Sequence, residues 1–192
     1  MPLTRIQSLG ITDGTIVNAD INASAAIAST KLSGVVSGLT AADQWRLTTN
    51  FSVSSGTTSD ITSNWEQNDS TGFTVLGSSM TQSSGIFTFP STGYWLINYI
   101  MNPISSSTDD YVGGYISITT DNSTYTDVTE TYGNQRAVNA DTIVISSFIF
   151  DVTSTTNCKV KFKGRAGNTT ENFQGNTTKN RTHVTFIRLG DT

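Results

Sequence analysis

The side chains able to carry out catalysis or bind a metal are few in this chain of 192 residues. It has one histidine, His183, and one cysteine, Cys158, besides fifteen Asp and Glu residues. A structural zinc site takes four ligands, mostly Cys and His, so a single copy of this chain lacks them. A Ser–His–Asp arrangement commonly presents its serine in a G-x-S-x-G turn, and that sequence is absent. We therefore expect His183 to be a strand residue and Cys158 to be a small core residue.

Two groups of acidic residues have the carboxylate oxygens that calcium prefers. Asp109 and Asp110 form the first group, and Asp121, Asp127 and Glu130 form the second. Neither group has the spacing of an EF-hand loop. A glycoside hydrolase needs two carboxylates that face each other across a cleft, and no motif marks such a pair. We expect no catalytic residue, no metal site and no cofactor, and the chain is predicted not to be an enzyme.

Alternating charge marks the segment 159–163. Lys159, Lys161 and Lys163 fall on one face of a predicted strand, while Val160 and Phe162 fall on the other. The pattern favours a solvated strand face. The alternative is contact with an acidic neighbour or with an anionic glycan on a cell surface.

Composition points to β-structure with a polar, uncharged surface. Charged residues make up 14% of the chain, and it contains 33 Thr, 24 Ser and 15 Asn. Threonine favours strands, whereas Ser and Asn favour turns. The net charge of −4 argues against a general nucleic-acid binder. There is neither an apolar run of about 20 residues nor a signal-peptide pattern, so we expect no membrane insertion and assembly in a cytoplasm.

The first 44 residues differ from the rest, because every aromatic residue lies at position 45 or later. Residues 25–32 have the pattern of a short helix. Isolated Ile and Leu side chains recur at steps of five or six residues, which fits neither a helix nor a strand. Such a segment can bury its apolar side chains by winding around copies of itself or by lying on another protein; the alternative is a disordered arm. The anchoring residues predicted in this segment are Ile6, Ile11, Ile16, Ile21, Ile27 and Leu32.

From Trp45 onward, short apolar runs alternate with turn residues every 8–12 positions, which predicts a sandwich or barrel. Residues 34–44 are expected to be a linker. Two of the predicted strands, 93–102 and 142–152, are apolar on both faces, so the outer face of their sheet should be covered as well. Another subunit is the favoured cover; loops or the N-terminal arm are the alternative. The predicted strands are 45–53, 72–77, 85–90, 93–102, 111–120, 124–131, 142–152, 157–164 and 182–189.

The segment 84–96 (SGIFTFPSTGYWL) resembles the G-x-F-x-x-P-x-x-G-x-Y signature of the complement/tumour-necrosis-factor superfamily of trimeric jelly rolls. Segments 141–145, 158–162 and 182–189 are similar to later strands of that family. The resemblance implies an all-β jelly-roll sandwich over residues 45–192 that forms a homotrimer. The residues expected in the trimer interface or the core are Phe87, Phe89, Tyr94, Leu96, Tyr99, Ile145, Phe148, Phe150 and Phe186.

The segment 13–28 (DGTIVNADINASAAIA) is similar to segments in fibres and other virion proteins of tailed bacteriophages. Together the two resemblances imply a structural protein of the virion, a trimeric fibre or spike. Residues 1–44 would be an extended arm for anchoring and trimerisation that binds capsid or tail proteins, and the head would bind a host-surface glycan. Three alternatives remain: a capsid decoration or cement protein, a glycan-degrading tip enzyme, and a free complement-like binding module.

Overall fold

The computed structural model describes Ile21 and residues 38–192. Ile21 is 40% exposed. The expected helix at 25–32 lies outside the described residues, and so do the anchoring residues Ile6, Ile11, Ile16, Ile27 and Leu32. Over residues 38–192 every regular element is a β-strand, as the abundance of Thr predicted, and every strand pair is antiparallel.

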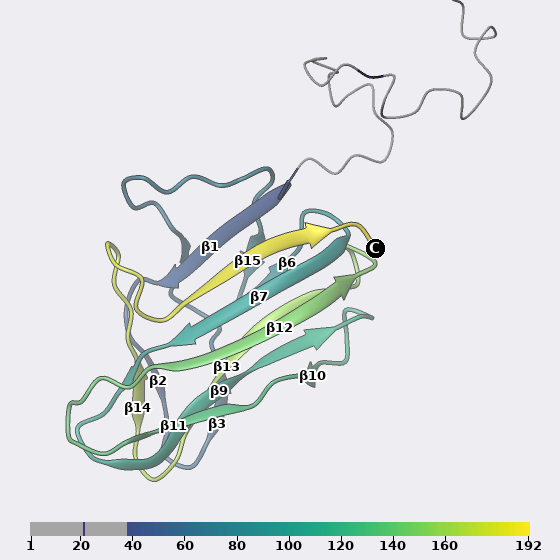
Figure 1. Cartoon of the computed structure of the whole chain (residues 1–192). Coiled ribbons are helices and arrows are strands. Elements are labelled where there is room, and N and C mark those ends of the chain that lie inside the picture. Colours follow the sequence, from purple (N-terminus) through teal and green to yellow (C-terminus); the bar gives the residue numbers. More distant parts are fainter. Residues whose placement is uncertain (1–20, 22–37) are drawn as a thin grey trace, which may run out of the picture. The chain divides into compact units, whose positions relative to one another are not determined.

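The first layer is a five-stranded sheet, which Figure 1 shows with β1, β15, β7 and β12 side by side. Its order is β12 (Val144–Val152), β7 (Gly93–Met101), β15 (His183–Gly190), β1 (Ala41–Leu47) and β4 (Trp65–Gln67). Strands adjacent in this sheet are far apart in the sequence, as expected for a jelly roll.

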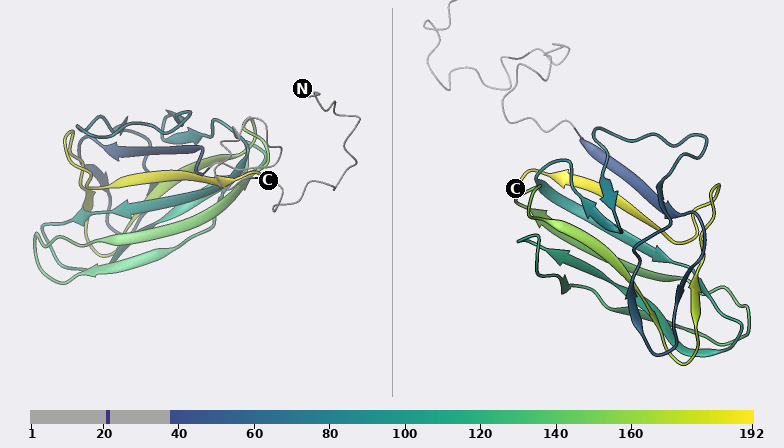
Figure 2. Two further views of the ribbon diagram at one scale, coloured as in Figure 1. Left: turned by 45° about the horizontal axis from the view of Figure 1, so that its top comes forward. Right: turned by 180° about the vertical axis from the view of Figure 1, so that it is seen from behind.

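The second layer has seven strands; Figure 2 shows both layers from two further sides. Its main path is β10 (Thr126–Asp127), β9 (Asp109–Thr119), β13 (Lys159–Ala166), β6 (Ile86–Thr88) and β5 (Thr81–Ser83). Two more strands join it: β11 (Thr131–Gln135) pairs with β9, and β3 (Thr58–Asp60) pairs with β13. A small third sheet consists of β2 (Phe51–Val53), β14 (Glu171–Phe173) and β8 (Pro103–Ile104).

Aromatic side chains fill the core between the two layers. Along β7 every second residue from Trp95 to Met101 is buried, as the two-residue period of a strand requires. Phe87 of β6 is central, because its ring makes edge or tilted contacts with those of Trp65, Phe162 and Phe186 at 5.4–5.5 Å. Because these aromatic rings contact one another, the buried side chains form one continuous core.

Two glycines of the 84–96 segment are required by the backbone. Gly85 has a φ of +77°, and a Cβ there would lie 2.2 Å from the carbonyl oxygen of Ile61. Gly93 has a φ of +130°, and a Cβ there would lie 2.4 Å from the carbonyl oxygen of Gly190. Both positions therefore exclude other residues. The spacing of these glycines in the motif reflects two places where strands approach closely.

Several elements differ from those predicted. The predicted strand 45–53 is two strands in different sheets, β1 and β2. Of the predicted strand 124–131, only Thr126–Asp127 forms β10 before β11 begins at Thr131. The short strands β3, β4, β5, β8 and β14 were not predicted.

The first strand begins at Ala41, inside the expected linker, because Asp43 is buried and accepts hydrogen bonds from the indole N–H of Trp45 and the backbone N–H of Met80. The segment 72–77 is not a strand. Gly72 and Gly77, at its two ends, both have positive φ, and only Leu76 forms a bridge, to Ala42.

Candidate functional site

The outward face of the five-stranded sheet carries an apolar row that crosses four strands. Residues opposite each other in a register point to the same side, and the registers place Ile149, Leu96, Ile187 and Ala42 in line. Leu76, bridged to Ala42, continues the line. At the two ends Ile149 is 55% exposed and Leu76 is 45% exposed. The row is therefore a strip of apolar surface open to solvent.

A second row runs parallel to the first, four residues away along each strand. It places Ile145, Ile100, His183 and Arg46 in line. Ile145 is 54% exposed, and the neighbouring Ile143 is 56% exposed. His183 is half-buried, and burial lowers the pKa of its imidazole below the ordinary value, although its contact with the backbone oxygen of Arg181 opposes this. The imidazole is therefore neutral at neutral pH, and it fits an apolar row.

The polar row between them is paired within the chain. Gln44, Thr185, Asn98 and Ser147 stand in line. The amide of Gln44 donates to the hydroxyl of Thr185 at 2.8 Å, and the hydroxyl of Ser147 donates to the amide oxygen of Asn98 at 2.7 Å. Burying a polar group is costly only when it is left without a partner. This face can accordingly be covered by an apolar partner at little polar cost.

The side chains predicted for the interface or the core divide between these two places. Five lie in the core between the layers: Phe87, Phe89, Tyr99, Phe150 and Phe186. Phe148 packs against that core and is partly buried. Tyr94, Leu96 and Ile145 lie on the outward face, where Tyr94 is 42% exposed and Leu96 is half-buried. Within residues 38–192 no segment covers these outward side chains.

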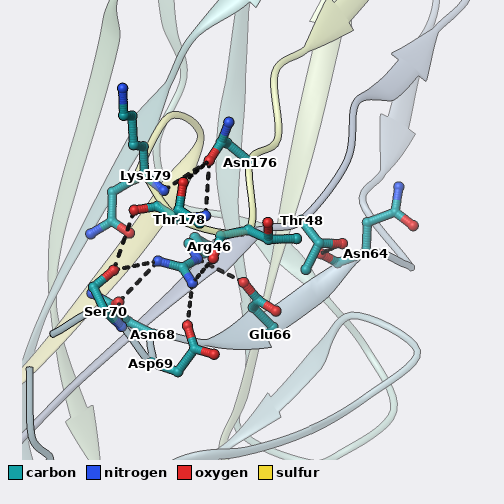
Figure 3. Close-up of polar contacts among 12 residues, drawn as sticks. Arg46, Thr48, Asn64, Glu66, Asn68, Asp69, Ser70, Asn176, Thr178 and Lys179 are labelled. Carbon is teal, nitrogen blue, oxygen red and sulfur yellow. Dashed lines mark hydrogen bonds and ion pairs between the residues drawn. The ribbon is translucent and has the colours of Figure 1, made fainter.

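A buried arginine closes one edge of the face (Figure 3). Arg46 is fully buried, and its guanidinium donates to Glu66 at 2.7 Å, to Ser70 at 2.7 Å and to Asn68 at 3.1 Å. It also contacts the carboxylate of Asp69 and the carbonyl oxygen of Thr177. The network joins β1, β4 and the loop that contains Thr177. This cluster was not predicted from the sequence, although the position of Arg46 between two large apolar residues, Trp45 and Leu47, is a signal.

The candidate catalytic and metal-binding side chains are separated. Cys158 is fully buried, as predicted for a core residue, and His183 lies on β15 as predicted. Asp109 accepts the backbone N–H groups of Gly167 and Asn168 at 3.0 and 2.8 Å, and Asp110 contacts the side-chain amide of Asn168. Among residues 38–192 and Ile21, no three His, Cys, Asp or Glu side chains gather as metal ligands.

The second group of acidic residues also has partners within the chain. Asp121 accepts from the hydroxyl of Thr119 and from two backbone N–H groups, which together lower the pKa of its carboxyl. Asp127 pairs with Lys163 at 2.7 Å. Glu130 accepts from Tyr132 and Tyr115, and these hydrogen bonds lower the pKa of its carboxyl. Asp121 thus caps a turn, Asp127 pairs with a lysine, and Glu130 positions two tyrosines.

The alternating cations of β13 face outward from the second layer, while Val160 and Phe162 face the core, as predicted. Lys161 pairs with Asp60 at 2.7 Å. Arg165 donates to the hydroxyl of Tyr111 at 2.7 Å. The outward faces of the two layers therefore differ in kind, one apolar and the other polar and aromatic. In the part of the chain that the structure describes, no helix is long and apolar enough to cross a membrane.

Comparison with known proteins identifies the fold. No family model and no curated protein sequence matches this chain. The structure of Eiger TNF from S. frugiperda superposes with a TM-score of 0.59 at 13% identity, over 79% of this chain and 93% of that chain. Murine APRIL gives a TM-score of 0.55 at 11% identity, over 78% of this chain and 98% of that chain. PRD1 vertex protein P5 gives a TM-score of 0.49 at 14% identity, over 80% of this chain and 100% of that chain.

The first two similarities confirm the all-β jelly roll of the tumour-necrosis-factor type that the 84–96 segment predicted. The sheet order of the first layer, β12-β7-β15-β1-β4, leaves the longest apolar strands, β7 and β12, together at one edge. The fold therefore places the first apolar row across four strands, and the apolar part of the second row on β12 and β7.

Proposed function

We propose that this chain is a non-enzymatic structural protein of a tailed-bacteriophage particle, a homotrimeric fibre or spike whose head attaches to a host-surface glycan. The observation that supports self-association most strongly is the open pair of apolar rows on the first layer. Large exposed apolar patches on a folded domain mark interaction sites. The partner is two further copies, as the resemblance to trimeric jelly-roll heads implies.

The energetics favour such an assembly. Fully burying an Ile side chain contributes roughly 1.5–3 kcal/mol, so covering the exposed half of Ile145 or Ile149 contributes about 1 kcal/mol each. The polar row between the two apolar rows already has its partners, so it adds little cost. Several such side chains in each of three interfaces can then offset the entropy lost on association.

The anchoring role is assigned to residues 1–44. That segment has apolar side chains at regular steps but no aromatic residue, and it is similar to segments of phage fibres. In this proposal it binds capsid or tail proteins, and the head is displayed outward. Threefold display multiplies weak contacts with a repeated surface glycan into firm attachment.

Particles assembled with the doubly substituted chain Ile16→Asp, Ile21→Asp test the anchoring role. We expect the variant head to fold and to be missing from purified particles, whereas Ile86→Asp, a substitution on the head, is incorporated normally. Normal incorporation of the arm variant refutes the anchoring role.

Immunogold labelling of wild-type particles locates the protein. Label at a tail or vertex tip agrees with a spike, whereas label spread over the capsid shell indicates a decoration protein.

A further inference from the structure

Three tyrosines form a platform on the outward face of the second layer. Tyr111 and Tyr115 come from β9 and Tyr132 from β11. The ring of Tyr132 contacts those of Tyr111 and Tyr115 edge-on, with centroids 5.6 and 6.2 Å apart. The hydroxyls of Tyr115 and Tyr132 both bond to Glu130. The rings are thus held in place on the surface, and a ligand would not have to order them.

A glycine makes room for the platform. Gly113 stands opposite Tyr132 in the β9–β11 register. A Cβ at Gly113 would lie 2.8 Å from the ring of Tyr132 and 1.9 Å from the carbonyl oxygen of Thr131. The ring lies across the strand only because this position has no side chain. Tyr132 nevertheless stays 42% exposed, so its ring is available to a ligand.

A polar hollow of about 600 Å³ adjoins the platform. Tyr115, Lys163 and Asp60 are opposite one another across β9, β13 and β3, and all three line it. Asp127 on β10 completes the far side. The remaining lining residues are Thr58, Ser59 and Thr62. Its volume lies within the usual range for small-ligand sites, roughly 300–1,000 Å³.

The charges around the hollow are balanced within the chain. Lys163 pairs with Asp127 and Lys161 pairs with Asp60, each at 2.7 Å. The ammonium of Lys161 also lies 4.4 Å from the ring centre of Tyr125. A carboxylate or sulfate on a ligand would have to compete with Asp60 and Asp127 for these cations. The hollow therefore favours a ligand that is uncharged and rich in hydroxyl groups.

We propose that this hollow and the adjoining ring of Tyr115 bind a neutral oligosaccharide. A pyranose has an apolar C–H face, which packs on an aromatic ring, and a rim of hydroxyls, which donate to carboxylates and accept from an ammonium group. The hollow supplies each of these partners: Tyr115, the carboxylates of Asp60 and Asp127, and Lys163. The inference rests on the proposed attachment function and assigns its binding site and ligand class.

One feature of this site favours binding over cleavage, and a second feature is compatible with a trimer. Asp60 and Asp127 are each held by a lysine at 2.7 Å, whereas a glycosidase needs two carboxyl groups that are free to face the scissile bond from opposite sides. The hollow lies on the outward face of the second layer, while the apolar rows lie on the outward face of the first. Three copies joined through the apolar rows would leave all three hollows open.

The test begins with the full-length wild-type protein on an array of neutral, sialylated and sulfated oligosaccharides, followed by titration of the strongest ligand. We expect a neutral glycan to bind, with a Kd that changes less than about threefold between 50 and 500 mM salt. Tyr115→Ala should weaken it at least tenfold. Tyr115→Phe, which keeps the ring, and Ile86→Ala, outside the hollow, should bind within threefold of wild type.

The outcomes separate the two proposals. If wild-type protein binds no glycan on the array, the attachment function fails and the site fails with it. If wild type binds but Tyr115→Ala binds equally well, attachment stands and this site is refuted. Selective binding of sulfated or sialylated glycans that weakens steeply with salt refutes the neutral ligand. Thermal unfolding of each variant checks its fold. Should the alanine variant unfold, a folded Tyr115→Phe variant that binds more than threefold weaker than wild type contradicts stacking on the ring.

Discussion

Leu96 of β7 and Ile149 of β12 stand directly opposite each other on the outward face of the first layer. Leu96 is half-buried by its neighbours, whereas Ile149, on the edge strand, is 55% exposed. The same register places Trp95 opposite Phe150, and both of these point into the core. One pair of strands thus presents apolar side chains both to the core and to the solvent, and the second surface is where another copy would pack.

Replacing Ile149 with Asp should prevent self-association. The carboxylate would stand at the exposed end of the apolar row, on the edge strand, where burial by a second copy without a partner for the charge costs several kcal/mol. We expect sedimentation-velocity measurements at micromolar concentration to show mainly monomer, with an unchanged circular dichroism spectrum. The matched control is Ile86→Asp, since Ile86 is also an exposed apolar strand residue, 37% exposed, but on the other layer. Equal sedimentation of the two variants contradicts the assignment of the interface.

The core depends on Phe87, and Phe87→Ala should destabilise the fold by roughly 3–5 kcal/mol. The ring is fully buried and contacts four other aromatic rings at 5.4–5.5 Å, so its removal leaves a large cavity. Phe148→Ala, at a partly buried ring, should cost clearly less. Denaturant unfolding at one fixed protein concentration measures both losses, and equal losses would show that the core is not centred on Phe87.

The strands around Trp95 and Ile149 were predictable from the sequence because long apolar runs with Val, Ile and aromatic residues have few other solutions. The predicted ranges 93–102 and 142–152 match β7 and β12 to within two residues. The segment 72–77 has a similar pattern, but its flanking glycines turn the chain away from the sheet. The alternation of apolar residues does not predict this turn, because the turn depends on how the backbone near Leu76 pairs with Ala42.

The candidate sites were harder to predict because they depend on pairings between distant strands. Arg46 reaches Thr177 across 131 positions, and Lys161 reaches Asp60 across 101. The alternation of Lys159, Lys161 and Lys163 predicted their shared face correctly. It did not predict that Asp60 and Asp127 would neutralise two of them, because those partners come from β3 and β10.

Removing the buried guanidinium should be costly. Arg46→Ala leaves the carboxylate of Glu66 without its donor in a poorly solvated place, and we expect a loss of about 3–5 kcal/mol. The pair with Asp69 adds little, because the side chain of Asp69 is 77% exposed. Thermal unfolding measures the effect, with Arg136→Ala as an exposed control expected within about 0.5 kcal/mol of wild type. A loss no larger than the control's refutes a structural role.

Stability should fall as the pH rises from about 4.5 to about 7, because of Glu171. Its side chain is fully buried, and within residues 38–192 neither carboxylate oxygen has a hydrogen-bond donor. Burial, followed by the charge of Asp109, raises the pKa of Glu171 from its ordinary 4.5 to about 7. A group whose pKa is higher in the folded state than in the unfolded state contributes stability that is fully present below the unfolded-state pKa. This contribution is lost as the pH rises through the folded-state pKa.

Thermal unfolding of wild type and Glu171→Gln at pH 5.5, 7.0 and 8.5 checks this. We expect the wild-type Tm to fall across this range relative to the variant, because glutamine stays neutral throughout. His183 has a lowered pKa and therefore destabilises at low pH, but it is present in both proteins and cancels in the difference. Parallel curves for the two proteins would show that Glu171 does not titrate near neutrality.

The mass of the full-length wild-type protein in solution, measured by sedimentation equilibrium, tests self-association through the open apolar rows most directly. We expect a single species of three times the chain mass of 20.6 kDa, persisting to sub-micromolar concentration. A stable monomer at every concentration would contradict it, because the outward side chains around Leu96 and Ile149 would then be exposed without a partner.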